Sequence, residues 1–344
     1  MKKNPIIDGH IDLAWNWLAL NRLFEDSVEL KGTKDTEEIK QYEGIASVGF
    51  PEIKQGNIRI IFGTIWVETI NSLHPSLGPK YNTAEESIAL AKKQYDYYLD
   101  LCKKNEDICL IKDYQTVSRV LFGDESHLGI VPIIEGADFI HNLNDLNYWL
   151  DLLGIKIIAP VWQKNQFGGC SELGGGITAE GKKFISNLTK LNCVIDIAHM
   201  SQQTADTVLN ESDTVIVNTH TACKHFVNDA RLITDSQIRK INEHNGVIGL
   251  MTWASKLSNR SSVSLTDFIK QIEHIANITG TIDNIAIGSS MDGGYGRDNL
   301  PHGMDNIGSL NKIGDTMLSY GFKDSDIESV LYKNWQRVLQ YAYK

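Results

Sequence analysis

The sequence is poor in the features that mark secreted, membrane and nucleic-acid-binding proteins. Its 344 residues include only five cysteines, an odd number without a CxxC pair, which is typical of a reduced compartment. No apolar run approaches the roughly 20 residues that span a bilayer, and no signal-peptide pattern follows Met1. The formal net charge is −10, and no Lys/Arg cluster offsets it. We therefore expect a cytoplasmic protein that binds neither membranes nor nucleic acid.

Motifs for two common kinds of catalysis are missing as well. The sequence contains no GxSxG nucleophile elbow and no glycine-rich phosphate loop of the Walker or Rossmann type. The glycines at 174–176 lack the partner residues that such a loop requires. A serine nucleophile or a nucleotide-dependent phosphoryl transfer is therefore weakly supported.

What the sequence does contain is an alternation of short apolar runs and longer helical patterns. Most runs are rich in Ile and Val and lack strict alternation, which is typical of parallel strands buried on both faces. They cover residues 5–10, 58–67, 129–135, 155–162, 193–199, 214–219, 246–251 and 284–289. Helix starts are indicated by capping boxes at Thr83, Thr234 and Ser325 and by N-caps at Thr178 and Ser201.

Eight strand–helix units predict an α/β fold, a single (β/α)8 TIM-type barrel formed by residues 1–344. An open, doubly wound sheet is the structural alternative. The polar segment 21–42 and the glycine-rich segment 163–177 exceed a minimal barrel, and each follows a strand. We therefore expect them among extra active-site loops, as lids or substrate walls. A plain surface insertion would equally explain 21–42.

Metal-type ligands fall at the predicted C-terminal ends of four strands. His10 and Asp12 end the first strand, and because residues i and i+2 point to the same side, both side chains can reach one point. Glu135 ends the third strand, His199 the fifth and His220 the sixth. A lone histidine at a strand end is usually a structural residue, but five such ligands at one face indicate a metal centre.

This ligand set predicts two metal ions that share Glu135 as a bridge, with His10 and Asp12 on one ion and His199 and His220 on the other. Imidazole nitrogen and carboxylate oxygen suit zinc best, with manganese or iron as other choices. Two such ions can hold a bridging hydroxide and polarise a carbonyl, which fits amide or ester hydrolysis. We expect hydrogen-bonded structural roles for the other histidines, such as His74, His127, His141, His225, His244, His274 and His302.

Short strings spread over nearly the whole chain, from Asp8 to about Val338, carry a family resemblance. They are Asp8-Gly-His-Ile-Asp12, Glu135-Gly136, Asp196-Ile-Ala-His-Met-Ser201, Thr219-His220, Asp229-Ala-Arg-Leu-Ile-Thr-Asp235, Gly246-Val-Ile-Gly249, Ile287-Gly-Ser-Ser-Met-Asp-Gly293 and Asn334-Trp-Gln-Arg337. Together these strings resemble the membrane dipeptidase (renal dipeptidase) family of zinc peptidases, within the amidohydrolase superfamily.

The resemblance implies a (β/α)8 barrel and two zinc ions on the same five ligands in the same pairing. It also implies an arginine after the sixth strand that binds the C-terminal carboxylate of the substrate, and Arg231 lies where that arginine falls. A guanidinium fork suits a carboxylate well. A surface salt bridge is the alternative role for Arg231.

Two positions depart from the family pattern. Trp162, followed by Asn165, stands where better-known members carry a histidine that holds the scissile carbonyl, and we expect both residues in substrate binding. A tryptophan can wall a pocket and donate its N–H, with core packing as the alternative. Ser290 stands where the family has its acid–base and amine-binding aspartate, and losing such a group typically costs ~10²–10⁴ in rate. Asp292 lies roughly 6–7 Å farther along a strand and could substitute only if the chain turns back.

We therefore expect a zinc-dependent dipeptidase that cleaves small dipeptides, with Glu135, Ser290 and Asp292 as catalytic residues. Because of Ser290, two alternatives stay open. One is a related metal-dependent amide or ester hydrolase, and the other is a catalytically silent barrel that binds a small ligand. The expected partner is a small dipeptide, and a homodimer is suggested by analogy with other barrels.

Overall fold

Eight parallel strands close into a barrel in the computed structural model, which describes residues 4–73, 76–123 and 127–344. Strand β1 pairs with β13 on one side and with β2 on the other, and β2 pairs with β6, so the sheet has no open edge at this point. The barrel strands are β1 (Ile6–Ile11), β2 (Ile58–Ile65), β6 (Leu128–Glu135), β7 (Ile157–Ala159), β10 (Val194–Asp196), β11 (Ile216–Thr221), β12 (Ile248–Leu250) and β13 (Ile285–Ile287). The TIM-type barrel predicted from the sequence is confirmed, and the doubly wound alternative is wrong.

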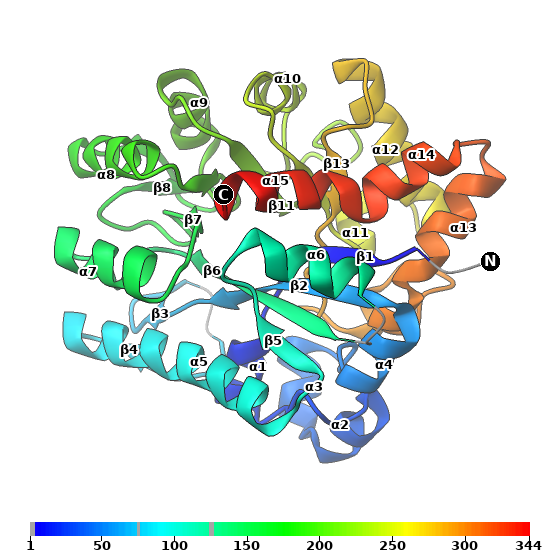
Figure 1. Ribbon diagram of the computed structural model, residues 1–344, viewed down its shortest axis with the longest axis horizontal. Coiled ribbons are helices and arrows are strands. Elements are labelled where there is room, and N and C mark those ends of the chain that lie inside the picture. The colour runs from blue at the N-terminus through cyan, green and yellow to red at the C-terminus, as the bar shows by residue number, and fades with distance from the viewer. Residues whose placement is uncertain (1–3, 74–75, 124–126) are drawn as a thin grey trace.

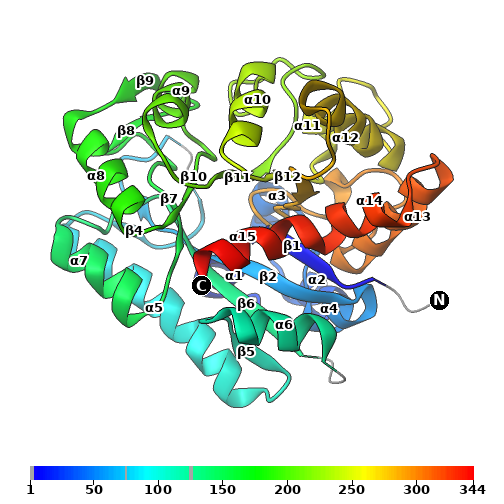
Figure 2. The same ribbon diagram turned by 45° about the horizontal axis from the view of Figure 1, so that its top comes forward.

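Helices surround the strands, as Figures 1 and 2 show. The long helix α5 (Ala84–Lys104) begins at a capping box on Thr83, as predicted, and the predicted boxes or N-caps at Thr178, Ser201 and Thr234 also open helices. The other helices of the ring are α6 (Tyr114–Phe122), α7 (Leu143–Asn147), α8 (Ala179–Lys190), α9 (Gln202–Glu211), α10 (Asp235–Glu243), α11 (Ala254–Leu257), α12 (Leu265–Thr279), α13 (Asn311–Ser319), α14 (Asp324–Glu328) and α15 (Asn334–Ala342).

The strands are buried on both faces because barrel interior and helix layer both exclude water from them. Every residue of β1 and of β6 is buried, which explains the runs rich in Ile that predicted them. Trp335 on α15 packs against strands β1 and β13, and its Nε1 donates to the Ile287 carbonyl at 2.7 Å. A Cβ at Gly9 would lie 2.5 Å from the Trp335 ring, so only glycine fits there.

Three details of the sequence prediction needed correction. The short strand β5 (Ile108–Leu110), which pairs with the first half of β6, was not predicted. The glycine-rich segment forms an antiparallel hairpin, β8 (Gly168–Cys170) and β9 (Gly174–Ile177), where we expected an irregular loop. The capping box predicted at Ser325 is wrong, because the N-cap of α14 is Lys323, two residues earlier, and Asp326 accepts from the Lys323 backbone N–H at 3.3 Å.

After β1 comes helix α1 (Leu13–Leu20), and the polar segment 21–42 that follows it forms α2 (Val28–Lys34) and most of α3 (Glu37–Glu43), before α4 (Phe50–Gly56). A buried ion pair fixes this segment: Arg22 Nη2 lies 2.8 Å from Asp35 Oδ2 and donates to the Gly44 carbonyl at 2.6 Å. The segment follows β1, so it stands at the C-terminal end of the barrel. Across the described ranges, no helix is long and apolar enough to cross a bilayer. His74 lies outside the described residues.

Candidate metal centre

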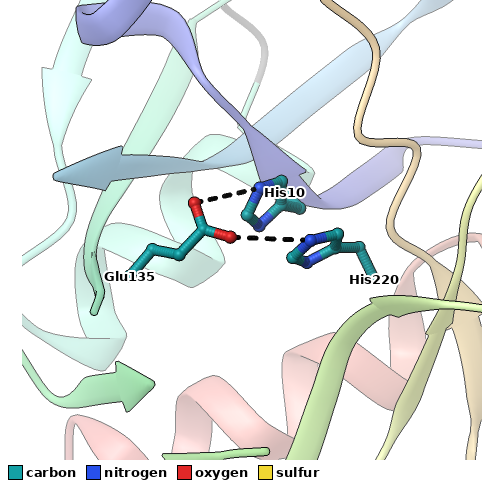
Figure 3. A group of neighbouring side chains, drawn as sticks. All are labelled: His10, Glu135 and His220. Atoms are coloured by element: carbon teal, nitrogen blue, oxygen red, sulfur yellow. Dashed lines mark ion pairs between the residues drawn. The ribbon is translucent and has the colours of Figure 1, made fainter. Parts of the chain in front are cut away.

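The C-terminal ends of four barrel strands bring the predicted ligands together. His10 comes from β1, Glu135 is the last residue of β6, His220 belongs to β11, and His199 follows β10. Figure 3 shows Glu135 beside His10 and His220, with one carboxylate oxygen facing each ring. These three residues are buried, and their ligand atoms lie within 4.8 Å of one another.

The two oxygens of Glu135 face two different groups of ligands. Oε1 lies 3.0 Å from His199 Nε2 and 3.5 Å from His220 Nε2, and these two nitrogens are 2.9 Å apart. Oε2 lies 3.5 Å from His10 Nε2, which is also 3.5 Å from Asp12 Oδ2. The geometry therefore has the form of two adjoining triangles of donors that share one carboxylate.

Burial and neighbouring charges shift the pKa values of the side chains in this cluster. Burial raises the pKa of Glu135 to about 8, since a desolvated carboxylate is costly. Burial would lower the pKa of His10, but the Glu135 and Asp12 carboxylates outweigh it and raise that pKa to about 9. Burial, together with the positive charges of His10 and Arg231, holds the pKa of His220 well below its usual range.

The unpaired nitrogens of His10 are a second, independent indication of a metal site. Both ring nitrogens of His10 are buried and have no hydrogen-bond partner among the described residues. Buried polar atoms are rarely left unpaired, so such an orphan needs an explanation. A cation bound at Nε2 would supply the missing partner. The donor set of imidazole nitrogens and carboxylate oxygens is the one expected for a divalent transition metal.

A polar relay behind His220 fixes which of its nitrogens is free. The Thr219 hydroxyl donates to Asp196 Oδ2 at 2.6 Å and lies 3.0 Å from His220 Nδ1. Since its single proton goes to the carboxylate, the hydroxyl accepts from His220 Nδ1–H. That tautomer leaves the Nε2 lone pair directed at Glu135 and His199, as a ligand requires. Asp196 is held in turn by the backbone N–H groups of Ala198 and Thr219, each at 3.0 Å.

The first pair of ligands has its own supporting contacts. Thr64 on β2 donates its hydroxyl to Asp12 Oδ1 at 2.6 Å, leaving Oδ2 toward His10. Although burial alone would raise the pKa of Asp12, His10 and Thr64 bring it below the usual value. Asp8 ties the strand ends together, since it accepts from the Ser289 N–H at 2.7 Å and from the Ser289 hydroxyl at 2.5 Å.

Backbone strain gathers at the same end of the barrel. Within the described ranges, seven residues other than glycine have a positive φ, and four of them are asparagines, which tolerate it well. The other three are His199 at 63°, Ser290 at 57° and Asp292 at 59°. All three follow barrel strands at their C-terminal ends. Strained backbone of this kind is typical of functional sites, where the surrounding contacts hold it in place.

Arg231 lies against the cluster from the loop after β11. Its Nη2 donates to the His220 carbonyl at 2.8 Å, while Nη1 is buried without a hydrogen-bond partner in the described part of the chain. The backbone N–H of Arg231 donates to Asp229 Oδ1 at 2.8 Å, and Asp229 pairs with Lys256. The structure therefore places Arg231 beside the candidate ligands with a free, desolvated donor, and not in a surface salt bridge.

The Ser290 hydroxyl and the Asp12 carboxylate flank one point. A Cβ on Gly293 would lie 2.5 Å from Asp12 Oδ2 and 3.0 Å from Ser290 Oγ. The backbone N–H of Ser290 donates to the His10 carbonyl at 3.1 Å. Ser290 is thus at the cluster, where the sequence placed it.

Asp292 points elsewhere. Its Oδ1 accepts from the backbone N–H and the hydroxyl of Ser47, each at 2.7 Å, and its Oδ2 accepts from the Val48 N–H at 3.0 Å. Both carboxylate oxygens therefore hold the backbone that leads into α4. This geometry disfavours the proton-transfer role that we expected for Asp292.

A cavity of about 290 Å³ opens beside Trp162. The Trp162 ring lies 5.5 Å from the His199 ring and 4.6 Å from the Trp66 ring, so it forms a wall between cavity and cluster. Asn165 lines the cavity, but its amide donates to Asp138 at 3.1 Å and to the Pro160 carbonyl at 3.0 Å. The structure thus supports a wall role for Trp162, whereas Asn165 chiefly orders its own loop.

Sequence reasoning missed four residues of this region. Thr219 and Thr64 gave no signal, because threonine is ordinary in a strand. Asp196 could have been found, since a carboxylate inside an apolar run needs partners. The remaining one, Asp138, lines the cavity and accepts from Tyr81, Gln163 and Asn165; burial raises its pKa despite these hydrogen bonds. The missed residues are Thr64, Asp138, Asp196 and Thr219.

Comparisons with known proteins agree with this geometry. The profile of the family described as membrane dipeptidase (peptidase family M19) matches residues 1–344. An uncharacterized protein in the pqqA 5′ region of Klebsiella pneumoniae is 28% identical over 235 residues, which are 64% of this chain and 84% of that protein. An uncharacterized dipeptidase of Schizosaccharomyces pombe is 21% identical over 146 residues, 42% of this chain and 35% of that protein.

Solved structures share the fold over the full length. A metallopeptidase from Rhodobacter sphaeroides, liganded with a phosphinate mimic of the dipeptide L-Ala-D-Ala, superposes with a TM-score of 0.81 at 20% identity, covering 99% of this chain and 100% of that one. A structure described as dipeptidase AC, a metallopeptidase, gives a TM-score of 0.82 at 21% identity, with 99% of each chain covered.

Proposed function

Because this chain belongs to the membrane dipeptidase family (peptidase family M19), whose members are metal-dependent dipeptidases, we propose that it hydrolyses small dipeptides with two zinc ions at the barrel mouth. One observation carries this proposal: the two oxygens of Glu135 face two separate ligand groups. A carboxylate in that position can bridge two ions. The alternative of a silent barrel would leave a costly cluster of buried, ionisable groups without a purpose.

The chain offers each ion a similar set of donors. In this proposal His10 and Asp12 bind one ion, His199 and His220 bind the other, and Glu135 binds both. Nitrogen and oxygen donors without thiolate suit zinc. When bound, such ions lower the pKa of a water nucleophile and polarise the scissile carbonyl. Thr219 and Asp196 keep the His220 tautomer that can bind, and Thr64 orients Asp12.

Arg231 would select the substrate end. Its unpartnered Nη1 is buried beside the cluster and suits the C-terminal carboxylate of a dipeptide. Such a charge-assisted hydrogen bond in a desolvated site would position the peptide bond over the ions. Trp162 would wall the adjoining cavity, which can accept a substrate side chain.

Ser290 limits the proton transfer that this site can perform. Its hydroxyl lies at the mouth beside Asp12 and can donate or accept a hydrogen bond, but it cannot transfer a proton at neutral pH as an aspartate can. Asp292 would serve as a positioning residue for the backbone at Ser47, not as the acid. Ser290 is also the observation that favours a second candidate, a metal-dependent hydrolase for amides that carry no free amine.

The first experiment is a metal count on protein purified without chelators. We expect about two equivalents of zinc per chain at the barrel mouth, and a screen of dipeptides, including L-Ala-D-Ala, should then reveal turnover. Glu135→Gln should weaken both ions together, while Glu180→Gln, an exposed glutamate on α8, should change neither. Loss of one ion alone would show that Glu135 does not bridge. Two ions with turnover of N-blocked amides only would favour the second candidate.

A further inference from the structure

A second group of metal-type side chains lies away from the barrel mouth. The ligand atoms of His225, Asp235 and His274 all lie within 4.8 Å of one another. His274 Nε2 is 2.9 Å from Asp235 Oδ1, and the His225 and His274 rings are stacked with centroids 4.2 Å apart. We propose that these three residues form a peripheral site for one divalent transition-metal ion, with zinc as its natural occupant.

The three ligands come from three separate elements. His225 lies in the loop after β11, Asp235 is the first residue of α10, and His274 lies on α12. Helices α10 and α12 are in contact, and both views show them beside each other on the same side of the barrel. Only the folded chain brings these side chains together, so an ion held by all three would link the loop to both helices.

The chemistry of the cluster suits a borderline cation. Two imidazoles and one carboxylate form an N₂O donor set, and water would complete a tetrahedral shell. Zinc lies about 2.0–2.2 Å from such donors, so donors that share an ion lie nearer together than the 4.8 Å limit. His225 is exposed, so a rotation of its side chain away from the stacked arrangement would close the remaining distance. The partly buried His274 and Asp235 are already paired.

A simple hydrogen-bonded pair explains only part of this arrangement. The His274–Asp235 contact accounts for two of the residues, as in many surface pairs. It does not involve His225, although a ring nitrogen of His225 also lies within 4.8 Å of the ligand atoms of His274 and Asp235. Two adjacent imidazolium ions would repel each other, whereas two neutral imidazoles can bind one cation together.

The position of the site gives it a consequence for Arg231. The loop between β11 and α10 carries both His225 and Arg231, and its two ends are tied where Lys224 N–H donates to the Ile233 carbonyl at 2.8 Å. An ion bound to His225 would fasten this loop to α10 and α12. The metal site stands without any assumption about the reaction, but its effect on Arg231 rests on the proposed function.

The test is a metal count by equilibrium dialysis against Zn²⁺, followed by thermal unfolding with and without the ion. The wild type should bind one equivalent more than His225→Ala, and His302→Ala, which removes another exposed histidine, should match the wild type. The Glu135→Gln variant lacks the shared carboxylate of the barrel centre but keeps the peripheral site. In this variant Zn²⁺ should still raise the Tm, and adding His225→Ala should abolish that rise.

The outcomes separate the two metal sites. Equal zinc content in the wild type and in His225→Ala overturns the peripheral site, whatever the barrel binds. One equivalent in the wild type that His225→Ala removes supports the peripheral site and contradicts the barrel centre. Because His225 is exposed, His225→Ala should fold normally, and an unchanged Tm in the presence of chelator will verify this.

Discussion

Replacing Thr219 by valine tests how the protein prepares His220 for metal binding. The substitution keeps the branched shape of the side chain but removes the hydroxyl that joins Asp196 Oδ2, at 2.6 Å, to His220 Nδ1, at 3.0 Å. The His220 ring would then be free to place its proton on Nε2, the nitrogen that faces Glu135. An imidazole in that tautomer cannot bind a metal through Nε2.

The size of the effect follows from the contacts that remain. Asp196 keeps the backbone N–H groups of Ala198 and Thr219, so the carboxylate stays in place and the fold should survive. Outer partners of metal ligands typically contribute 10–100-fold in affinity, which is about 1.4–2.7 kcal/mol. We therefore expect the ion at His199 and His220 to bind about 10–100-fold more weakly, with the ion at His10 and Asp12 nearly unchanged.

The assay is a zinc titration in competition with a chromophoric chelator, which resolves two ions of different affinity. Thr221→Val is the matched control: it removes a buried hydroxyl from the same strand, one that donates to the Ala222 carbonyl at 3.3 Å and has no other hydrogen bond among the described residues. Thr219→Ser restores a hydroxyl and should recover the affinity. If Thr219→Val binds both ions as tightly as Thr221→Val does, the relay does not prepare His220.

Three further predictions concern substrate, proton transfer and stability. Arg231→Ala should lower kcat/KM for dipeptides with a free carboxylate by about 10–100-fold, the value of a charged hydrogen bond, and leave kcat/KM for the corresponding amides unchanged. The control Arg239→Ala, at an exposed position, should change kcat/KM for neither substrate, and equal losses on both substrates in Arg231→Ala would contradict the role of Arg231. Ser290→Asp should raise turnover of dipeptides with a free amine, by up to ~10²–10⁴, and unchanged turnover would assign Ser290 to a different chemistry. Burial lowers the pKa of Lys31 to about 8 from 10.5. Between these two pH values the unfolded chain binds more protons at Lys31 than the folded chain does, so the free energy of unfolding rises with pH, by ~3 kcal/mol in total. Urea unfolding from pH 7 to 10 should show this rise in the wild type and not in Lys31→Met; parallel curves would refute it.

The barrel could be predicted because its strands are buried on both faces. A strand such as β6, with all eight residues buried, is apolar up to its last residue, Glu135, and that pattern is visible in the sequence. Strand β5 escaped because only three residues pair, and two of them are partly exposed. The hairpin β8–β9 escaped because glycine is depleted in strands, so its sequence indicates a loop.

That the candidate ligands lie together could be predicted for a related reason: the C-terminal ends of parallel strands meet in one place, so the order of these residues in the sequence gives their position in space. Contacts between other elements have no such rule. His225 and His274 seemed to be isolated surface residues, because nothing in the sequence shows that α12 packs beside the loop after β11. The assignments of zinc, of substrate, of a cytoplasmic location and of a homodimer stay predictions.

The left-handed backbone at the mouth also bears on how this site can evolve. At φ values of 57° to 63°, β-branched residues are excluded, while glycine, asparagine and aspartate fit readily. Position 290 can therefore exchange serine for aspartate without rebuilding the turn around it. Since the backbone already accepts either side chain, a lineage could gain or lose a proton-transfer group there while keeping its metal ligands. Substrate preference in this fold can thus diverge at a single position, with the barrel and its ligands left as they are.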